Sequence, residues 1–158
     1  MFSDLTTKTR MRNLLIIVLS LSFFSFDLPA GWFKAGSQPK SYEMGIDKGA
    51  GMDGGNAATI RSIEKKINGF GTLMQTCSSS KYLGKRVRMT GKMKTKDVEE
   101  WSGIWFRVDE KNSDKPLAFD NMHEGKTDRS IKGTTDWKSY EIVLDVPVNA
   151  YELAFGAL

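Results

Sequence analysis

Apolar and polar residues alternate with a period of two in three long runs of this chain. The runs cover residues 86–94, 104–108 and 140–146. A period of two places successive side chains on opposite faces of a strand, so each run predicts a strand with one buried and one hydrated face. We therefore expect an antiparallel β-structure that carries any function on its outward faces or its loops.

Turn residues separate these runs and the shorter ones around them. The 15 glycines lie largely between the runs, as turns require. The spacing gives about nine strands, which is typical of an antiparallel β-sandwich or jelly roll. The predicted strands cover residues 24–28, 42–47, 57–62, 71–77, 85–95, 103–109, 117–121, 137–146 and 151–157. A polar turn is expected at residues 97–100 and a long polar loop at residues 123–136.

Alternation also predicts which side chains fill the core. Burying a side chain of this kind contributes roughly 1.5–3 kcal/mol, which explains these residues without a functional role. The residues expected to face inward are Val87, Met89, Met93, Ile104, Phe106, Val108, Tyr140, Ile142, Leu144, Val146, Leu153 and Phe155.

The N-terminal residues differ in composition from the rest of the chain. Lys8, Arg10 and Arg12 precede residues 14–26, which carry no charge. A helix that spans a bilayer needs about 20 apolar residues, and this shorter run fits the core of a secretory signal. We expect residues 1–22 to be a signal peptide or an N-terminal anchor, residues 23–158 to be one domain, and the protein to be secreted or periplasmic.

Composition argues against several kinds of chemistry. The formal net charge of +4 is too small to favour nucleic acid as a partner. Cys77 is the single cysteine and His123 the single histidine, which disfavours a zinc site or a His-activated nucleophile. We expect Cys77 to be a small buried residue and His123 to be exposed. Adjacent acids at turns, such as Glu99 and Glu100, are usually solvated, so we expect no enzymatic activity.

Trp105 and Arg107 are the first candidates for ligand binding, because they lie opposite the core residues of their strand. An aromatic ring stacks on the apolar face of a sugar, and a polar group beside it fixes the orientation. The alternative is that a loop or the N-terminal segment covers Trp105. If residues 85–95 lie in the same sheet, Gln75 and a basic stripe would join this face. The stripe consists of Arg86, Arg88, Lys92, Lys94 and Lys96.

Three further residues and the basic stripe each have two interpretations. Asp120 and Asn121 could bind sugar hydroxyl groups or cap their own turn. Trp101 could be an exposed platform for a sugar or could pack under a loop. The basic stripe could bind phosphates or an acidic polysaccharide, or could be a solvated strand face that resists aggregation.

Four segments, in order, bear a family likeness. Ser25–Trp32 is an opening element, Tyr82–Val87 holds a Tyr-x-Gly-Lys turn, Thr135–Glu141 is a strand led by Trp, and Val146–Gly156 is a proline turn and strand. These segments resemble jelly-roll carbohydrate-binding modules of the galactose-binding-like fold. Trp105–Asp109 and Ala118–Met122 are similar to a bacterial subgroup of such domains, which occurs alone behind export signals or appended to enzymes and regulators. The resemblance implies a non-catalytic module that binds a carbohydrate, or alternatively an interaction module or a detached sensor domain.

The chain departs from that family after its Phe-Gly strand. The family continues into a last strand, whereas this chain ends at Leu158. We therefore expect a truncated module with an open sheet edge, able to pair with a protein partner or with a second copy. Structural calcium in the family uses acidic groups of the first and last strands. Only Asp27 matches them, which leaves calcium binding open.

Overall fold

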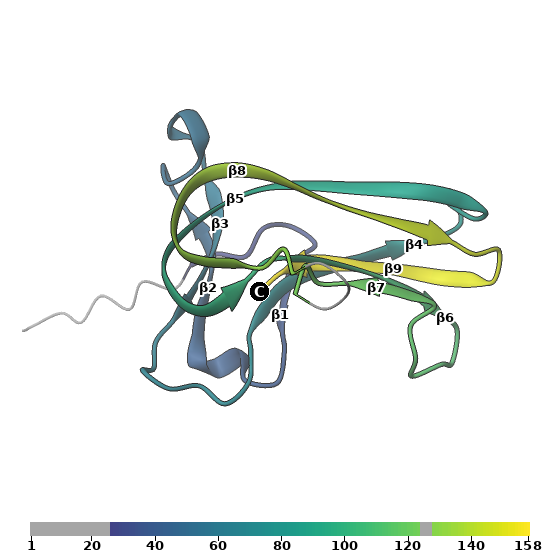
Figure 1. Cartoon of the computed structure of the whole chain (residues 1–158), viewed down its shortest axis with the longest axis horizontal. Coiled ribbons are helices and arrows are strands. Elements are labelled where there is room, and N and C mark those ends of the chain that lie inside the picture. The colour runs from purple at the N-terminus through teal and green to yellow at the C-terminus, as the bar shows by residue number, and fades with distance from the viewer. Residues whose placement is uncertain (1–25, 124–127) are drawn as a thin grey trace, which may run out of the picture.

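The computed structural model describes residues 26–123 and 128–158, and this part of the chain is all-β apart from two single-turn 3-10 helices (Figure 1). The helices are η1 (Pro39–Ser41) and η2 (Met52–Gly54). All strand pairs are antiparallel, as the alternation predicts. The strands are β1 (Phe33–Ala35), β2 (Tyr42–Asp47), β3 (Ala57–Ser62), β4 (Thr72–Ser78), β5 (Lys85–Ser102), β6 (Ile104–Glu110), β7 (Ala118–Asp120), β8 (Ile131–Val146) and β9 (Ala150–Ala157).

Two layers of strands enclose the core. One layer is a five-stranded sheet in the order β1-β4-β9-β6-β7, and the other is a long two-stranded ribbon of β5 and β8. Figure 1 shows the ribbon lying over the sheet, with the β2–β3 hairpin at one end. The inner faces of both layers are apolar, as a sandwich requires, and the outer face of the five-stranded sheet carries a second, smaller apolar cluster.

The predicted inward residues form the main core. All twelve belong to one hydrophobic cluster between the layers, to which Met122 and Ile131 also contribute. Val108 is 0% exposed, Ile142 1% and Leu153 2%. The prediction is confirmed because parity along a strand fixes the face of each side chain, whatever its neighbours are.

The prediction of a strand at residues 24–28 is wrong for residues 26–28, the part that the structure describes. Residues 26–28 form no strand, and β1 lies further along the chain. The carbonyl of Asp27 accepts one bond from the Ile46 amide at 2.7 Å, and a turn follows in which the Trp32 amide donates to the Pro29 carbonyl at 3.0 Å. Pro29 has no N–H to continue a ladder, so the segment turns away after a single bond.

The ribbon is longer than the sequence indicated. The expected turn at 97–100 is part of β5, and the expected loop at 123–136 contains the first residues of β8. Register shifts after Met93, Thr95 and Val98 interrupt the pairing. The first shift adds one residue on β8 and the second adds one on β5, so the inward parity changes on each strand, strict alternation is lost and the sequence looks like a loop. Asp97 at φ 52° and Gly133 at φ 69° occupy the bends.

The proposed signal at residues 1–22 lies outside the described residues. Within 26–123 and 128–158, no helix has the length and hydropathy needed to cross a bilayer.

Candidate functional site

The single outward face expected from the sequence does not form, because its members lie in different layers. The basic stripe is on the ribbon, whereas Trp105 and Arg107 are on the outer face of the five-stranded sheet. Gln75 pairs with Phe155, which pairs with the core residue Phe106, so Gln75 faces the interior and is half-buried. Gln75 therefore lies on the opposite side of the sheet from Arg107.

Trp105 is buried, so the expectation of an exposed stacking ring is wrong for this residue. The side chain is 6% exposed and packs against Met74 and Ala154. Its Nε1 donates to Thr72 Oγ1 at 2.8 Å. Ala35 of β1 and Leu158 also pack against this cluster, so an edge strand and the last residue help to cover the ring.

Asp120 and Asn121 cap their own turn, the alternative that the sequence left open. Asp120 Oδ1 accepts the Met122 amide at 2.8 Å, and its other oxygen pairs with Arg129. Asn121 Oδ1 accepts the His123 amide at 3.1 Å, and this side chain is buried. Bonds of this kind occupy the groups that a sugar hydroxyl would need.

Trp101 is half-buried and stacks on His123. The ring centroids are 4.5 Å apart and the planes differ by 18°. His123 is exposed, as predicted, and its Nδ1 lies 3.6 Å from Asp128 Oδ1. Hydrogen bonds from Ser130, followed by the nearby His123, lower the pKa of Asp128. One face of the indole is therefore already covered by His123.

Among the described residues, no three His, Cys, Asp or Glu side chains gather to hold a metal ion. Asp27, the residue matched to a calcium ligand, is exposed. Cys77 is also exposed, contrary to the expectation that it is buried.

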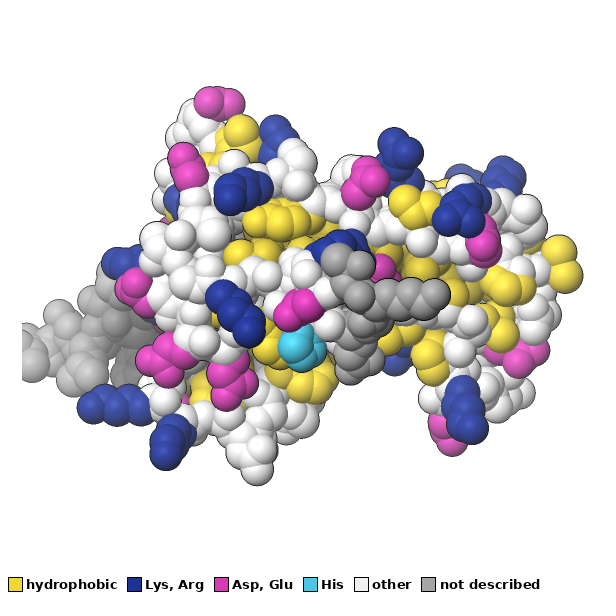
Figure 2. Space-filling view, in the orientation of Figure 1, with side chains coloured by type: hydrophobic (Ala, Val, Ile, Leu, Met, Phe, Trp, Pro, Cys, Tyr) yellow, Lys and Arg dark blue, Asp and Glu magenta, His cyan; other side chains and the backbone are white. Residues whose placement is uncertain are grey.

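A pocket of about 520 Å³ opens where β6 ends, between the loop after β6 and strand β9. This loop projects at the lower right of Figure 1, and Figure 2 shows basic and acidic side chains on it. The lining residues are Arg107, Asp109, Glu110, Lys111, Asn112, Ser113, Asp114, Tyr151 and Glu152. Of the sequence-predicted binding residues, the pocket contains Arg107.

A β-bulge places the aromatic ring of this pocket. Asp109 pairs with Glu152 and Glu110 with Ala150, so Tyr151 is an extra residue of β9 with no partner on β6. A bulge re-aims the side chain of the extra residue. The Tyr151 ring is 58% exposed, and Lys111 Nζ lies 5.6 Å from its centroid.

Two hydrogen bonds orient the charged groups beside this ring. Arg107 Nε donates to Asp109 Oδ2 at 2.8 Å, and Asn149 Nδ2 donates to Glu110 Oε1 at 2.8 Å. An arginine has five N–H donors, and the bond to Asp109 uses one of them. The pocket thus combines an exposed ring with held donors and acceptors, which can bind a ligand that has both an apolar face and hydroxyl groups.

Sequence reasoning missed Tyr151, Glu110, Lys111 and Glu152. Tyr151 lies in a strand whose alternation gives no sign of a bulge. The acidic pair at 109–110, followed by Lys111, does not indicate binding by itself, because adjacent acids at turns are usually solvated. The signal that could have indicated this pocket is the cluster of polar residues directly after the strand that carries Arg107.

No family model matches the chain. A comparison with curated proteins finds the uncharacterized HTH-type transcriptional regulator YbfP of Bacillus subtilis (strain 168), which is 42% identical over 127 residues. The match covers 80% of this chain and 41% of the relative, so the chain spans about two fifths of that regulator's length.

Proposed function

We propose that this chain is a non-catalytic module of the galactose-binding-like jelly-roll type that binds a carbohydrate at the pocket of Arg107 and Tyr151. The observation that carries the proposal is the exposed Tyr151 ring beside the Arg107–Asp109 pair. A sugar ring has an apolar face and a rim of hydroxyl groups. An aromatic side chain packs on such a face, and held charged groups form strong bonds to the rim.

The bonding of the acids supports binding rather than hydrolysis. Asp109 accepts a hydrogen bond from Arg107 and Glu110 accepts one from Asn149, so both carboxylates are held in place as acceptors. A glycosidase needs two carboxyl groups that flank the bond to be cleaved, one of which donates a proton to the leaving group. Acceptors that neighbouring side chains hold in place are suited to binding hydroxyl groups instead.

The proposal is tested with a glycan array of neutral and acidic sugars, followed by calorimetry of the best ligand. We expect Arg107→Ala and Tyr151→Ala each to weaken binding about tenfold, the loss of one good contact. Tyr82→Ala is the matched control, because Tyr82 is an exposed tyrosine in the turn before β5. Equal binding by all three variants, or an array without any ligand, would contradict the proposal.

A second candidate function is a sensor domain like a segment of a transcriptional regulator. The 42% identity to an HTH-type regulator supports it. The test replaces the matching segment of that relative by this chain and measures a reporter gene with and without the sugar found on the array. If the chimaera binds the sugar but reporter expression does not change when the sugar is added, the result would count against a sensor function.

Export is proposed separately, from the basic and then apolar pattern of residues 8–26. Cell fractionation of the full chain, compared with Ile16→Arg/Val18→Arg, tests it. Signal function depends on the apolar run, so the double variant should remain in the cytoplasm. An unchanged distribution would refute export and favour a sensor inside the cell.

A further inference from the structure

The two strands of the ribbon pair with each other along one edge and differ in what lies beside the other edge. β8 lies against β6 and β7, and Arg129 donates to the Glu141 carbonyl on β8 at 3.1 Å. β5 runs for 18 residues and pairs with β8 on one side, and no other strand within 26–123 and 128–158 pairs with it. An edge of this length is a ready template for another strand.

The cover over the five-stranded sheet is complete along β6 but fades along β4. On β6, the inward side chains of Ile104, Phe106 and Val108 are 6%, 2% and 0% exposed. On β4, Leu73 is 1% exposed, whereas Gln75 is half-buried and Cys77 is exposed. The ribbon therefore covers the β6 side of the sheet and leaves the end of β4 open.

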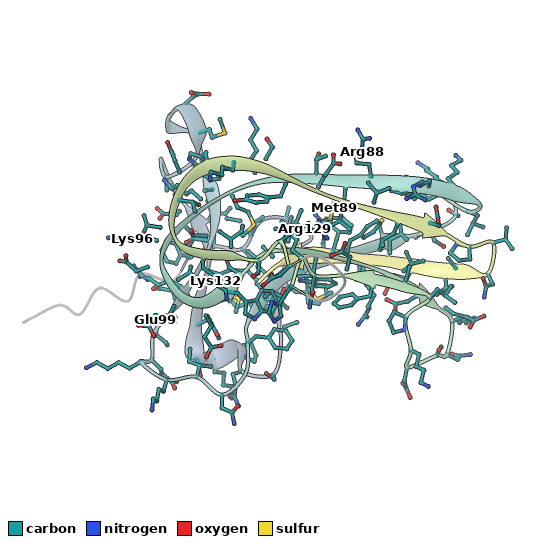
Figure 3. The ribbon with its side chains drawn as sticks, viewed as in Figure 1. Arg88, Met89, Lys96, Glu99, Arg129 and Lys132 are labelled. Carbon is teal, nitrogen blue, oxygen red and sulfur yellow. The ribbon has the colours of Figure 1, made fainter. Side chains whose placement is uncertain are left out.

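The ribbon shows the same gradient from β8 to β5. Ile142 is 1% exposed, whereas Met89, its direct partner on β5, is partly buried. Figure 3 shows Met89 pointing toward the other layer and Arg88 pointing away from the molecule. A third strand beside β5 would cover Met89 on the ribbon and Cys77 on the sheet.

The charge on β5 determines which strand fits. Asp145 lies 3.4 Å from Arg86 and Glu141 lies 3.6 Å from Arg88. Across the part of the chain that can be described, no carboxylate forms an ion pair with the other basic side chains of the strand, which are Lys85, Lys92, Lys94 and Lys96. Figure 2 shows Lys and Arg side chains along the upper margin of the molecule, over the ribbon.

We propose that the open edge of β5 binds an extended segment of a protein partner as a third strand of the ribbon, with acidic and apolar residues alternating along that segment. The apolar residues would cover Met89, and the acidic residues would lie beside the lysines. Opposite charges across neighbouring strands stabilise a sheet, and backbone bonds along the edge supply affinity. A second copy that pairs over residues 86–96 fits less well, because two such basic segments would place like charges side by side.

The test uses a labelled nine-residue peptide of alternating Val and Glu, with the full chain. Fluorescence anisotropy measures binding, and the alkylation rate of Cys77 reports the position, because this is the single thiol of the chain. We expect saturable binding. The alkylation rate of Cys77 should fall in proportion to the fraction of the chain that has bound peptide. A peptide with Lys in place of Glu, and one with a central Pro, should bind at least about tenfold more weakly.

The matched variants separate the edge from general charge. Lys92→Glu/Lys94→Glu/Lys96→Glu should lose about tenfold in affinity for the Glu peptide, because three favourable cross-strand charge pairs become unfavourable. Lys48→Glu/Lys65→Glu/Lys66→Glu makes the same change in net charge on exposed residues outside the ribbon, and should bind as the unmodified chain does. Circular dichroism confirms that both variants fold.

Three outcomes would overturn the proposal. One is binding of the Glu peptide that leaves alkylation of Cys77 unchanged, and another is equal binding of the Lys peptide. The third is self-association at rising concentration that protects Cys77 without peptide, which would identify a second copy as the occupant.

Discussion

At the residue scale, neighbours on other strands decide what a side chain can do. Trp105 and Tyr151 are both aromatic residues on or beside the outer face of the same sheet. Trp105 is buried with its N–H on Thr72, whereas Tyr151 is lifted into solvent by a bulge. The buried tryptophan packs within the fold, whereas the exposed tyrosine is the ring that we propose contacts a ligand.

Thr72→Val tests the structural role of the Thr72 hydroxyl under Trp105. The substitution keeps the shape of Thr72 but removes a hydroxyl that accepts the indole N–H and donates to the Ala157 carbonyl at 2.7 Å, which leaves the buried indole donor unsatisfied. We expect a loss of about 1–3 kcal/mol in the free energy of unfolding, measured by urea denaturation. Thr76→Val, at an exposed position of the same strand, should change stability by less than about 0.5 kcal/mol. Equal effects at the two positions would argue against this role.

Glu152→Gln tests the surroundings of Cys77. Partial burial, followed by the negative charge of Glu152, raises the pKa of the Cys77 thiol. Removing that charge should lower the pKa, so that the thiolate forms at a lower pH and alkylation at mildly alkaline pH becomes faster. The measurement is the alkylation rate against pH. Glu64→Gln is the control. If Glu152→Gln leaves the pH profile of Cys77 alkylation unchanged, the charge of Glu152 has no effect on the thiol.

At the element scale, the ribbon of β5 and β8 depends on its bulges. Three register shifts allow two long strands to bend, so that β5 continues into β6 in the other layer. Asp97 holds one bend: its amide donates to Thr134 Oγ1 at 3.0 Å, and the Thr134 hydroxyl donates back to Asp97 Oδ1 at 3.1 Å. The ribbon thus links the two layers as well as covering the core.

Gly133→Ala tests the bend on β8. Gly133 has φ 69°, and no heavy atom lies within 4 Å of an added Cβ, so any cost comes from backbone conformation rather than from a clash. We expect a loss of about 1 kcal/mol in the free energy of unfolding. Gly133→Asn should recover part of the loss, because Asn tolerates the left-handed region better. An alanine variant as stable as the original chain would mean that the bend relaxes freely.

At the scale of the whole molecule, stability should be highest at β6 and β9 and lowest at the margins. β6 and β9 lie inside the five-stranded sheet and supply fully buried side chains, whereas the edge strands β1 and β7 have three residues each. Local opening costs least where few apolar groups are buried.

Hydrogen exchange followed by mass spectrometry tests this gradient. Amides of β6 and β9 should exchange most slowly, those of β5 faster, and those of β1 and β7 fastest. The Val–Glu peptide should slow exchange along β5 while leaving β7 unchanged. Uniform protection across the sheet would contradict the gradient that the burial indicates.

The sequence could predict much of the fold but little of the candidate site. Alternation located most strands and all twelve inward side chains, because parity is a local property of an extended chain. It also identified Arg107 as a residue that faces away from the core. It could not identify Tyr151, because the bulge arises from the pairing of β9 with β6 and leaves no mark on the alternation of β9.

The sequence by itself determined that this protein is built of antiparallel strands and which side of each strand is apolar. Tertiary structure decided which strands share a layer, which outward residues are covered, and which edge is left open. The physical reason is that side-chain parity depends on one strand alone, whereas pairing and cover depend on residues far apart in the chain. Trp105 and Cys77 show the consequence: the first has an outward parity but is buried, and the second has an inward parity but is exposed.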